Sequence, residues 1–143
     1  FESRRHLSLE GDDVPLGFWV LDWSSAKLTA AVAKILAREV IGVHAVTSGI
    51  GSESETSLYA TAGCEYPEEY SDVSRVGCSA DDYWSSRHHV GLEIWALSKL
   101  DAMRQRLQPL GLQHIIPEEG HMGYTGHEGM YLFEKDLNDA FES

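Results

Sequence analysis

The chain has 143 residues, 43% of them hydrophobic, which fits a single domain with a sizeable core. Its 23 acidic residues outnumber its 11 lysines and arginines, giving a formal net charge of −12 at pH 7. The basic residues are scattered, so nucleic acid and an anionic membrane surface are poor partners. A cationic ligand suits this charge, although an acid excess more often only keeps a protein soluble.

Residues 1–13 are polar and charged without a period, and we expect a flexible N-terminal segment ahead of a domain spanning 14–143. The chain begins with Phe1 and contains neither the apolar core of a signal peptide nor an apolar run of about 18 residues. We therefore expect a processed or excised chain that does not insert directly into a membrane.

The next residues predict a strand, a helix and a second strand. The run 16–21 is apolar and aromatic-rich, as in a strand covered on both faces. N-cap residues follow at 22–25, and apolar residues then recur at helical spacing as far as Ile41, before Gly42 in the position of a left-handed cap. A second strand predicted at 43–46 completes a βαβ unit, so we expect a mostly parallel sheet.

The residues after this strand predict a turn at 48–52 and a second helix. Ser52 and Glu55 have the spacing of a capping box, and the helix is expected to run to about Ala62. The two glycines of the turn lack the rest of a phosphate-binding fingerprint and a following lysine. Phosphate binding is therefore disfavoured.

Cys64 and Cys78 lie 14 positions apart in a polar, acid-rich connection that we interpret as an insertion at about 64–87. A disulfide would contribute about 3 kcal/mol in the chain-entropy model and would indicate an oxidising compartment. Two buried free thiols are the alternative. Neither the cysteine nor the histidine spacing matches a zinc motif, so we expect no metal and no cofactor.

The apolar residues of 87–95 alternate with Gly91, Glu93 and Trp95, which predicts a strand that ends on an indole. Trp23 lies just past the carboxyl end of the first predicted strand. Carboxyl ends of parallel strands share one edge, so the two indoles can face a common crevice, with packing on the core as the alternative. Indoles in acidic surroundings suit a quaternary ammonium cation.

The C-terminal part predicts four further features. They are an amphipathic helix marked by Leu100, Met103 and Leu107 and stopped by Pro109 and Gly111, a strand at 112–116, a glycine-rich loop at 120–129 with a strand at 130–133, and the beginning of a helix in the last ten residues.

Three segments occur in an informative order: WSSAKLTAAVAKIL at 23–36 with IGV at 41–43, VGLEIW at 90–95, and GYTGHEGMY at 123–131. They resemble the first strand, helix and second strand, the strand ending in Glu-Val-Trp, and the Gly-Tyr-x-Gly-x-x-Gly-x-Tyr segment of substrate-binding proteins from glycine betaine and related quaternary-amine ABC transporters. The resemblance frames about residues 14–133.

This resemblance implies an α/β fold, with a mostly parallel sheet and flanking helices, that forms one lobe of a type II periplasmic-binding-protein-like fold. In that family the ligand lies between two lobes in an aromatic cage. The cage residues expected from the matched segments are Trp95, Trp23 and Tyr124. We add Ser24 and Ser25, at a helix start that favours a ligand carboxylate, and Glu93 as further ligand-binding residues.

The expected function is a non-enzymatic, extracytoplasmic solute-binding domain for a quaternary ammonium compound, glycine betaine or choline, in ABC-type transport and osmoprotection. Its partners would be the ligand, a second lobe and the transporter's membrane subunits, within a larger membrane-associated protein. The chain is short for a two-lobed protein and carries the 64–87 insertion. A sensory or scaffold domain with a degenerate pocket is therefore the alternative, and an unrelated α/β enzyme using Glu93 or a histidine is the third hypothesis.

Overall fold

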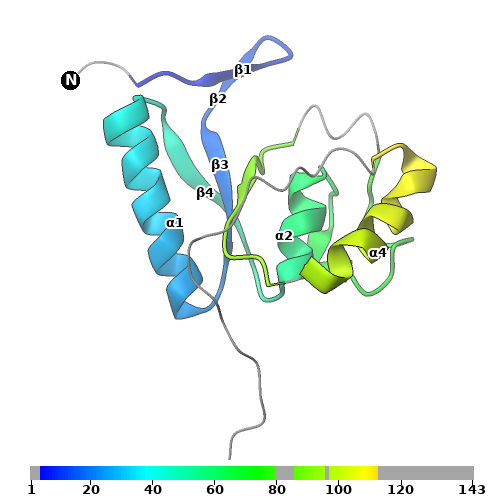
Figure 1. Cartoon of the computed structure of the whole chain (residues 1–143). Coiled ribbons are helices and arrows are strands. Elements are labelled where there is room, and N and C mark those ends of the chain that lie inside the picture. Colours follow the sequence, from blue (N-terminus) through cyan, green and yellow to red (C-terminus); the bar gives the residue numbers. More distant parts are fainter. Residues whose placement is uncertain (1–3, 80–85, 96, 113–143) are drawn as a thin grey trace, which may run out of the picture.

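The computed structural model describes residues 4–79, 86–95 and 97–112, which form an α/β fold (Figure 1). The strands are β1 (Leu7–Leu9), β2 (Asp12–Val14), β3 (Leu16–Leu21), β4 (Ala45–Gly51) and β5 (Val90–Gly91). The helices are α1 (Ser24–Leu36), continued by the π-helix η1 (Ala37–Ile41), then α2 (Ser54–Thr61) and α4 (Leu97–Leu107), with the 3-10 turns η2 (Pro67–Glu69) and η3 (Gln108–Leu110).

Strand β3 is the centre of a three-stranded parallel sheet with the order β4-β3-β5. Its side chains alternate between two helices, because successive residues of a strand point to opposite faces. Phe18 and Val20 pack in a cluster with Ala30 of α1, whereas Trp19 and Leu21 share a cluster with Ala60 of α2 and with Ala26 in the first turn of α1. Figure 1 shows α1 and α2 on opposite sides of the strands, with α4 beyond α2. The predicted α/β fold with a mostly parallel sheet and flanking helices is confirmed.

The predicted turn at 48–52 is wrong, because β4 continues to Gly51. Gly49 and Gly51 lie against the indole of Trp19, and a Cβ atom at either position would overlap that ring. Glycine in a strand often marks such a close approach rather than a turn. Helix α2 consequently begins at Ser54 with Glu53 at its N-cap, and neither residue of the predicted capping box caps it.

The N-terminal residues carry more structure than their polar sequence predicts. β1 and β2 form an antiparallel pair in which Leu7 faces Val14. Glu10 and Gly11 form the turn with φ values of 51° and 93°, and positive φ at both central residues is typical of the tight turns that match the twist of a hairpin. The predicted N-terminal segment therefore contains a β-hairpin over residues 7–14.

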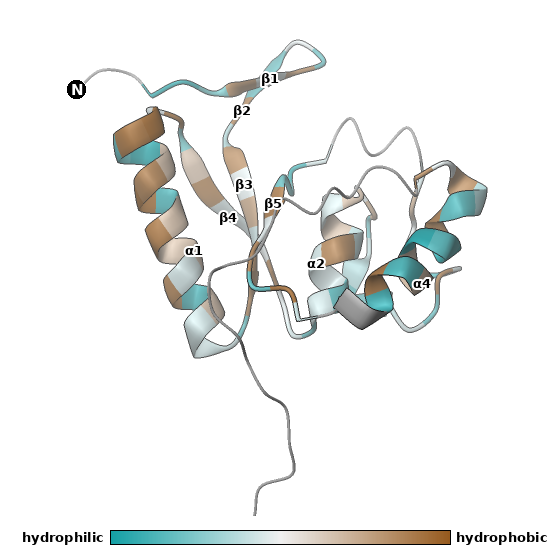
Figure 2. Cartoon of the chain, in the orientation of Figure 1, coloured by the Kyte–Doolittle hydropathy of each residue, from teal (hydrophilic) through white to brown (hydrophobic). Residues whose placement is uncertain are grey.

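Helix α1 packs on the sheet through small residues. The helix predicted from apolar spacing is present, and Gly42 follows it in the left-handed conformation with φ 76°. The buried residues are Ala26 and Ala30 of α1 and Ala37 of η1, which allow a close approach to β3. The large apolar residues lie 50–75% exposed on the outer side, where Figure 2 shows brown residues along the helix: Leu28, Val32, Ile35, Leu36, Val40 and Ile41.

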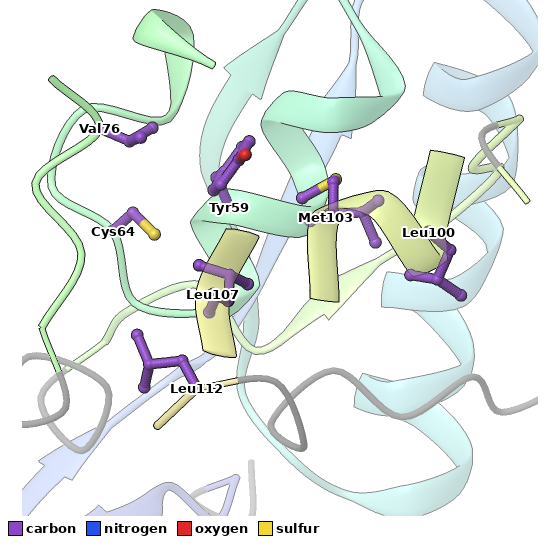
Figure 3. Close-up of a cluster of buried hydrophobic side chains, with 9 residues drawn as sticks. Tyr59, Cys64, Val76, Leu100, Met103, Leu107 and Leu112 are labelled. Atoms are coloured by element: carbon purple, nitrogen blue, oxygen red, sulfur yellow. The ribbon is translucent and has the colours of Figure 1, made fainter. Parts of the chain in front are cut away.

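A second core joins α2, the disulfide loop and α4 (Figure 3). Cys64 and Cys78 form a disulfide with a sulfur–sulfur distance of 2.03 Å. The loop between them directs Val76 into a cluster with α2 and α4, so this polar connection also contributes to the core. The cluster contains Leu58, Tyr59, Ala62, Cys64, Val76, Leu100, Met103, Leu107 and Leu112.

The amphipathic helix predicted around residues 100–107 is confirmed as α4, and Gly111 ends the following turn with φ 72°. Its apolar residues face the second core, as the spacing predicts. The remaining predicted features, from residue 113 of the 112–116 strand to the C-terminal helix, lie outside the described residues.

The packing of α1 predicts an unusual pattern of stability effects. Ala30 is 2% exposed, and Ala30→Leu should lower the free energy of unfolding by about 1–3 kcal/mol because the larger side chain has no room. Val32 is 50% exposed, so Val32→Ala should change it by less than about 0.5 kcal/mol. Urea unfolding followed by circular dichroism measures both. A larger loss from Val32→Ala would contradict this packing.

The disulfide loop should contribute measurably to stability, because the bridge closes a 14-residue separation and Cys64 is 3% exposed. The double variant Cys64→Ser/Cys78→Ser should lose about 2–4 kcal/mol of unfolding free energy. Urea titrations with and without dithiothreitol provide the control, since reductant should lower the wild-type midpoint and leave the variant unchanged. Equal urea midpoints for the wild type and the variant in the absence of dithiothreitol would argue against the bridge.

Candidate functional site

Three loops meet at the carboxyl edge of the parallel sheet. They are residues 22–25 after β3, residues 52–54 after β4 and residues 92–95 after β5. The amide of Asp22 donates to the carbonyl of Gly51 at 3.0 Å, which joins the first two loops. Helices α1 and α2 begin at this same edge, at the bottom of Figure 1. Carboxyl edges of this kind are where open α/β sheets place ligands.

The loop after β5 is attached to the first turns of both helices. The hydroxyl of Ser25 in α1 donates to Oε1 of Glu93 at 2.5 Å. The amide of Trp95 donates to Oγ of Ser54 in α2 at 3.0 Å. Glu93 is only 5% exposed, so its carboxyl group lies inside this junction rather than on the surface. The two contacts fix the position of Trp95 relative to the helix starts.

Glu93 does not lie in a strand, which corrects the predicted strand over 87–95. β5 ends at Gly91, and Glu93 has a φ of 60°, the left-handed region that residues other than glycine rarely adopt. The alternation therefore breaks there: Leu92 packs against the α1 side of the sheet, whereas Ile94 packs against the disulfide core. Such a backbone costs about 1–3 kcal/mol and concentrates at functional sites.

The two indoles reach the same edge but differ in environment. Trp95 is 44% exposed. Trp23 is half-buried and packs against the cluster that contains Trp19 and Leu21. Among the described residues the aromatic ring pairs are His6 with His44 and Trp19 with His88, so the two indoles do not stack on each other. Tyr124, the third predicted cage residue, lies outside the described residues.

Acidic side chains that sequence reasoning missed also gather at this edge. Burial raises the pKa of the Glu68 carboxyl group above its ordinary value, and the negative charge of Asp22 raises it further. Glu68 belongs to the disulfide loop, and only the folded loop places it near β3. Glu55 binds the ammonium group of Lys99 at 2.6 Å and raises its pKa. The negative charge of Glu53, which precedes α2, raises that pKa further. Asp22 alone had a sequence signal, since it directly follows a strand.

His88 and His89 lie at the amino end of β5, away from these loops. His89 Nδ1 accepts the amide of Gly17 at 2.8 Å, and His88 Nδ1 lies 2.9 Å from Oγ of Ser48. The ring of His88 meets Trp19 edge-on at 4.8 Å. These contacts give the histidines structural roles. No group of three or more histidine, cysteine or acidic side chains is placed to hold a metal ion within residues 4–79, 86–95 and 97–112.

These histidines predict a loss of stability in mild acid. Burial lowers the pKa of both His88 and His89 below the ordinary 6.5, and the neighbouring charges of His89 and Arg87, respectively, add to the effect. Because the folded pKa is depressed, the stability is present above pH 6.5 and is lost as the pH falls through the folded values. The unfolding free energy measured from pH 8 to pH 5 should therefore fall less steeply in His88→Gln/His89→Gln than in the wild type. Parallel curves would refute this explanation.

The described helices contain no segment long and apolar enough to cross a membrane. The comparisons with known proteins add no relative. No protein-family model matches the sequence, and neither the curated proteins nor the solved structures contain a significant match.

Proposed function

We propose that this chain is one lobe of a solute-binding protein that holds a quaternary ammonium cation at the carboxyl edge of its sheet. The observation that carries the proposal is the indole of Trp95, 44% exposed on an anchored loop among acidic side chains. The resemblance of residues 23–36 and 90–95 to quaternary-amine binding proteins supports it. The type II binding-protein lobe and the ABC transporter are parts of this same proposal.

Trp95 has the properties of a cation-binding ring. The indole of tryptophan has a large aromatic face, and a cation above such a face gains about 0.5–2 kcal/mol of binding free energy. The amide of Trp95 is held by Ser54, and the neighbouring Glu93 is held by Ser25. A fixed backbone lowers the entropy that binding must overcome. Trp23 lies at the same edge, at the N-cap of α1, where its carbonyl accepts the amide of Lys27 at 3.1 Å.

The electrostatics of the edge favour a positive ligand. Asp22, Glu53 and Glu93 belong to the segments that meet there, the charge of Asp22 reaches Glu68 of the disulfide loop, and the ammonium group of Lys99 is bound by Glu55. The protein as a whole carries a formal charge of −12. Such a field raises the local concentration of cations and speeds their association. A trimethylammonium group, which donates no hydrogen bonds, then selects aromatic faces over carboxylates.

The proposal assigns this chain one lobe of a two-lobed protein. A single lobe offers one wall, and a second lobe would close over the ligand and exclude water. The same proposal places the protein outside the cytoplasm, where disulfides such as that between Cys64 and Cys78 persist. It assigns the chain no catalytic step.

Calorimetric titration tests the proposal. The intact chain should give saturable heat with tetramethylammonium, the bare head group shared by these ligands. Trp95→Ala should weaken binding about 2- to 30-fold, the loss of one cation–π contact. Tyr66→Ala is the matched control, because Tyr66 is an aromatic residue 54% exposed on the disulfide loop. Absence of heat with tetramethylammonium, or equal affinities for wild type and Trp95→Ala, would exclude this site.

A further inference from the structure

We infer that Glu93 selects the class of ligand: the site takes a quaternary ammonium cation that lacks a carboxylate, such as choline, in preference to a zwitterion such as glycine betaine. This inference rests on the proposed function. It concerns the other end of the ligand, because choline and glycine betaine share the trimethylammonium group and differ only there. It follows from what occupies the N-terminus of α1.

The start of α1 is a place that attracts negative charge. The helix has 13 residues, its N-cap Trp23 makes no side-chain cap, and its first turn contains no acidic residue. The first amides of such a helix lack intrahelical partners and carry the positive end of the helix dipole. They therefore form a site suited to a carboxylate, whether it comes from a ligand or from the protein.

In this chain a carboxyl group of the protein lies beside the helix start and binds a side-chain hydroxyl there. Ser25, the second residue of α1, donates its hydroxyl to Oε1 of Glu93 at 2.5 Å, across 68 positions of sequence. Glu93 is 5% exposed, so its carboxyl group fills the space beside the helix start. A ligand carboxylate directed to the same helix end would meet this group. The expectation that this helix end holds a ligand carboxylate rests on the general preference of helix starts for anions.

The second oxygen of Glu93 strengthens the selection. Oε2 is buried and has no hydrogen-bond partner among the described residues, whereas buried polar atoms almost always have one. An unpaired carboxyl oxygen favours a nearby positive charge or hydroxyl donor and repels a second carboxylate. The left-handed backbone of Glu93, with φ 60°, holds the group in this position despite its cost.

The other charges of the edge act in the same direction. Asp22, Glu53 and Glu68 are acidic, and Lys99 is bound to Glu55. A zwitterion therefore gains at its cationic end and loses at its anionic end. Choline gains at its cationic end and carries a hydroxyl group that can donate a hydrogen bond.

The test compares choline with glycine betaine, because both share the trimethylammonium head group. Calorimetric titration of the intact wild-type chain should give at least a tenfold tighter dissociation constant for choline. Glu93→Gln keeps the shape of the side chain but removes its charge, and it should reduce the ratio at least threefold, mainly through tighter binding of glycine betaine. Glu10→Gln is the matched control, since it makes the same change in net charge at an exposed residue of the β1–β2 hairpin, away from this edge, and should leave the ratio unchanged.

Each outcome has a distinct meaning. If tetramethylammonium, choline and glycine betaine all give no heat, the proposed function fails and the inference fails with it. If tetramethylammonium binds and glycine betaine binds as tightly as choline, the function stands and the inference is overturned. A preference for choline that Glu93→Gln leaves unchanged would remove Glu93 as its cause. Should Glu93→Gln not fold, judged by thermal unfolding, the wild-type ratio alone still decides the preference.

Discussion

The packing of Trp19 against Gly49 and Gly51 is the contact on which the rest of the structure depends. The indole lies over the two glycines of β4, and its Nε1 donates to Oγ1 of Thr56 in α2 at 3.1 Å. This single side chain thereby connects β3 with its parallel neighbour β4 and with helix α2. Because β3 and β4 are held in parallel register, their carboxyl ends coincide, and so do the starts of α1 and α2. The candidate site exists as a consequence of that pairing.

Glu93 brings several energetically unfavourable features together in the candidate site. Glu93 combines a left-handed backbone, a buried carboxyl group and an oxygen without a partner among the described residues. Each feature is unfavourable for folding, and together they occur where three loops and two helix starts converge. The disulfide cluster around Tyr59 and Leu107 is held mainly by apolar contacts, and the buried hydroxyl of Tyr59 likewise has no hydrogen-bond partner among the described residues. Local cost at a ligand edge, supported by rigid elements, is the pattern expected of a binding site.

The outer side of α1 illustrates how packing can reverse a sequence pattern. Its apolar spacing predicts a helix correctly, yet the alanines face the sheet and the large residues face outward. Phe18 and Val20 already fill the space between helix and strand, so only small residues fit opposite them. Periodicity establishes that a helix forms. The volume available at the interface decides which side is buried.

The sequence by itself determined the strand, helix and parallel strand at the start of the domain, the helix around Met103, and the position of Trp23 directly past the end of the first strand. These follow from local spacing, caps and the right-handed crossover, which act over short distances. Only the tertiary structure decided how far β4 extends, because Gly49 and Gly51 make room for the indole of Trp19. It also decided that Glu68 lies at this edge, because the folded disulfide loop places its carboxyl group near Asp22. It also decided that Glu93 turns inward to Ser25, since that contact joins residues 68 positions apart and no local pattern encodes it.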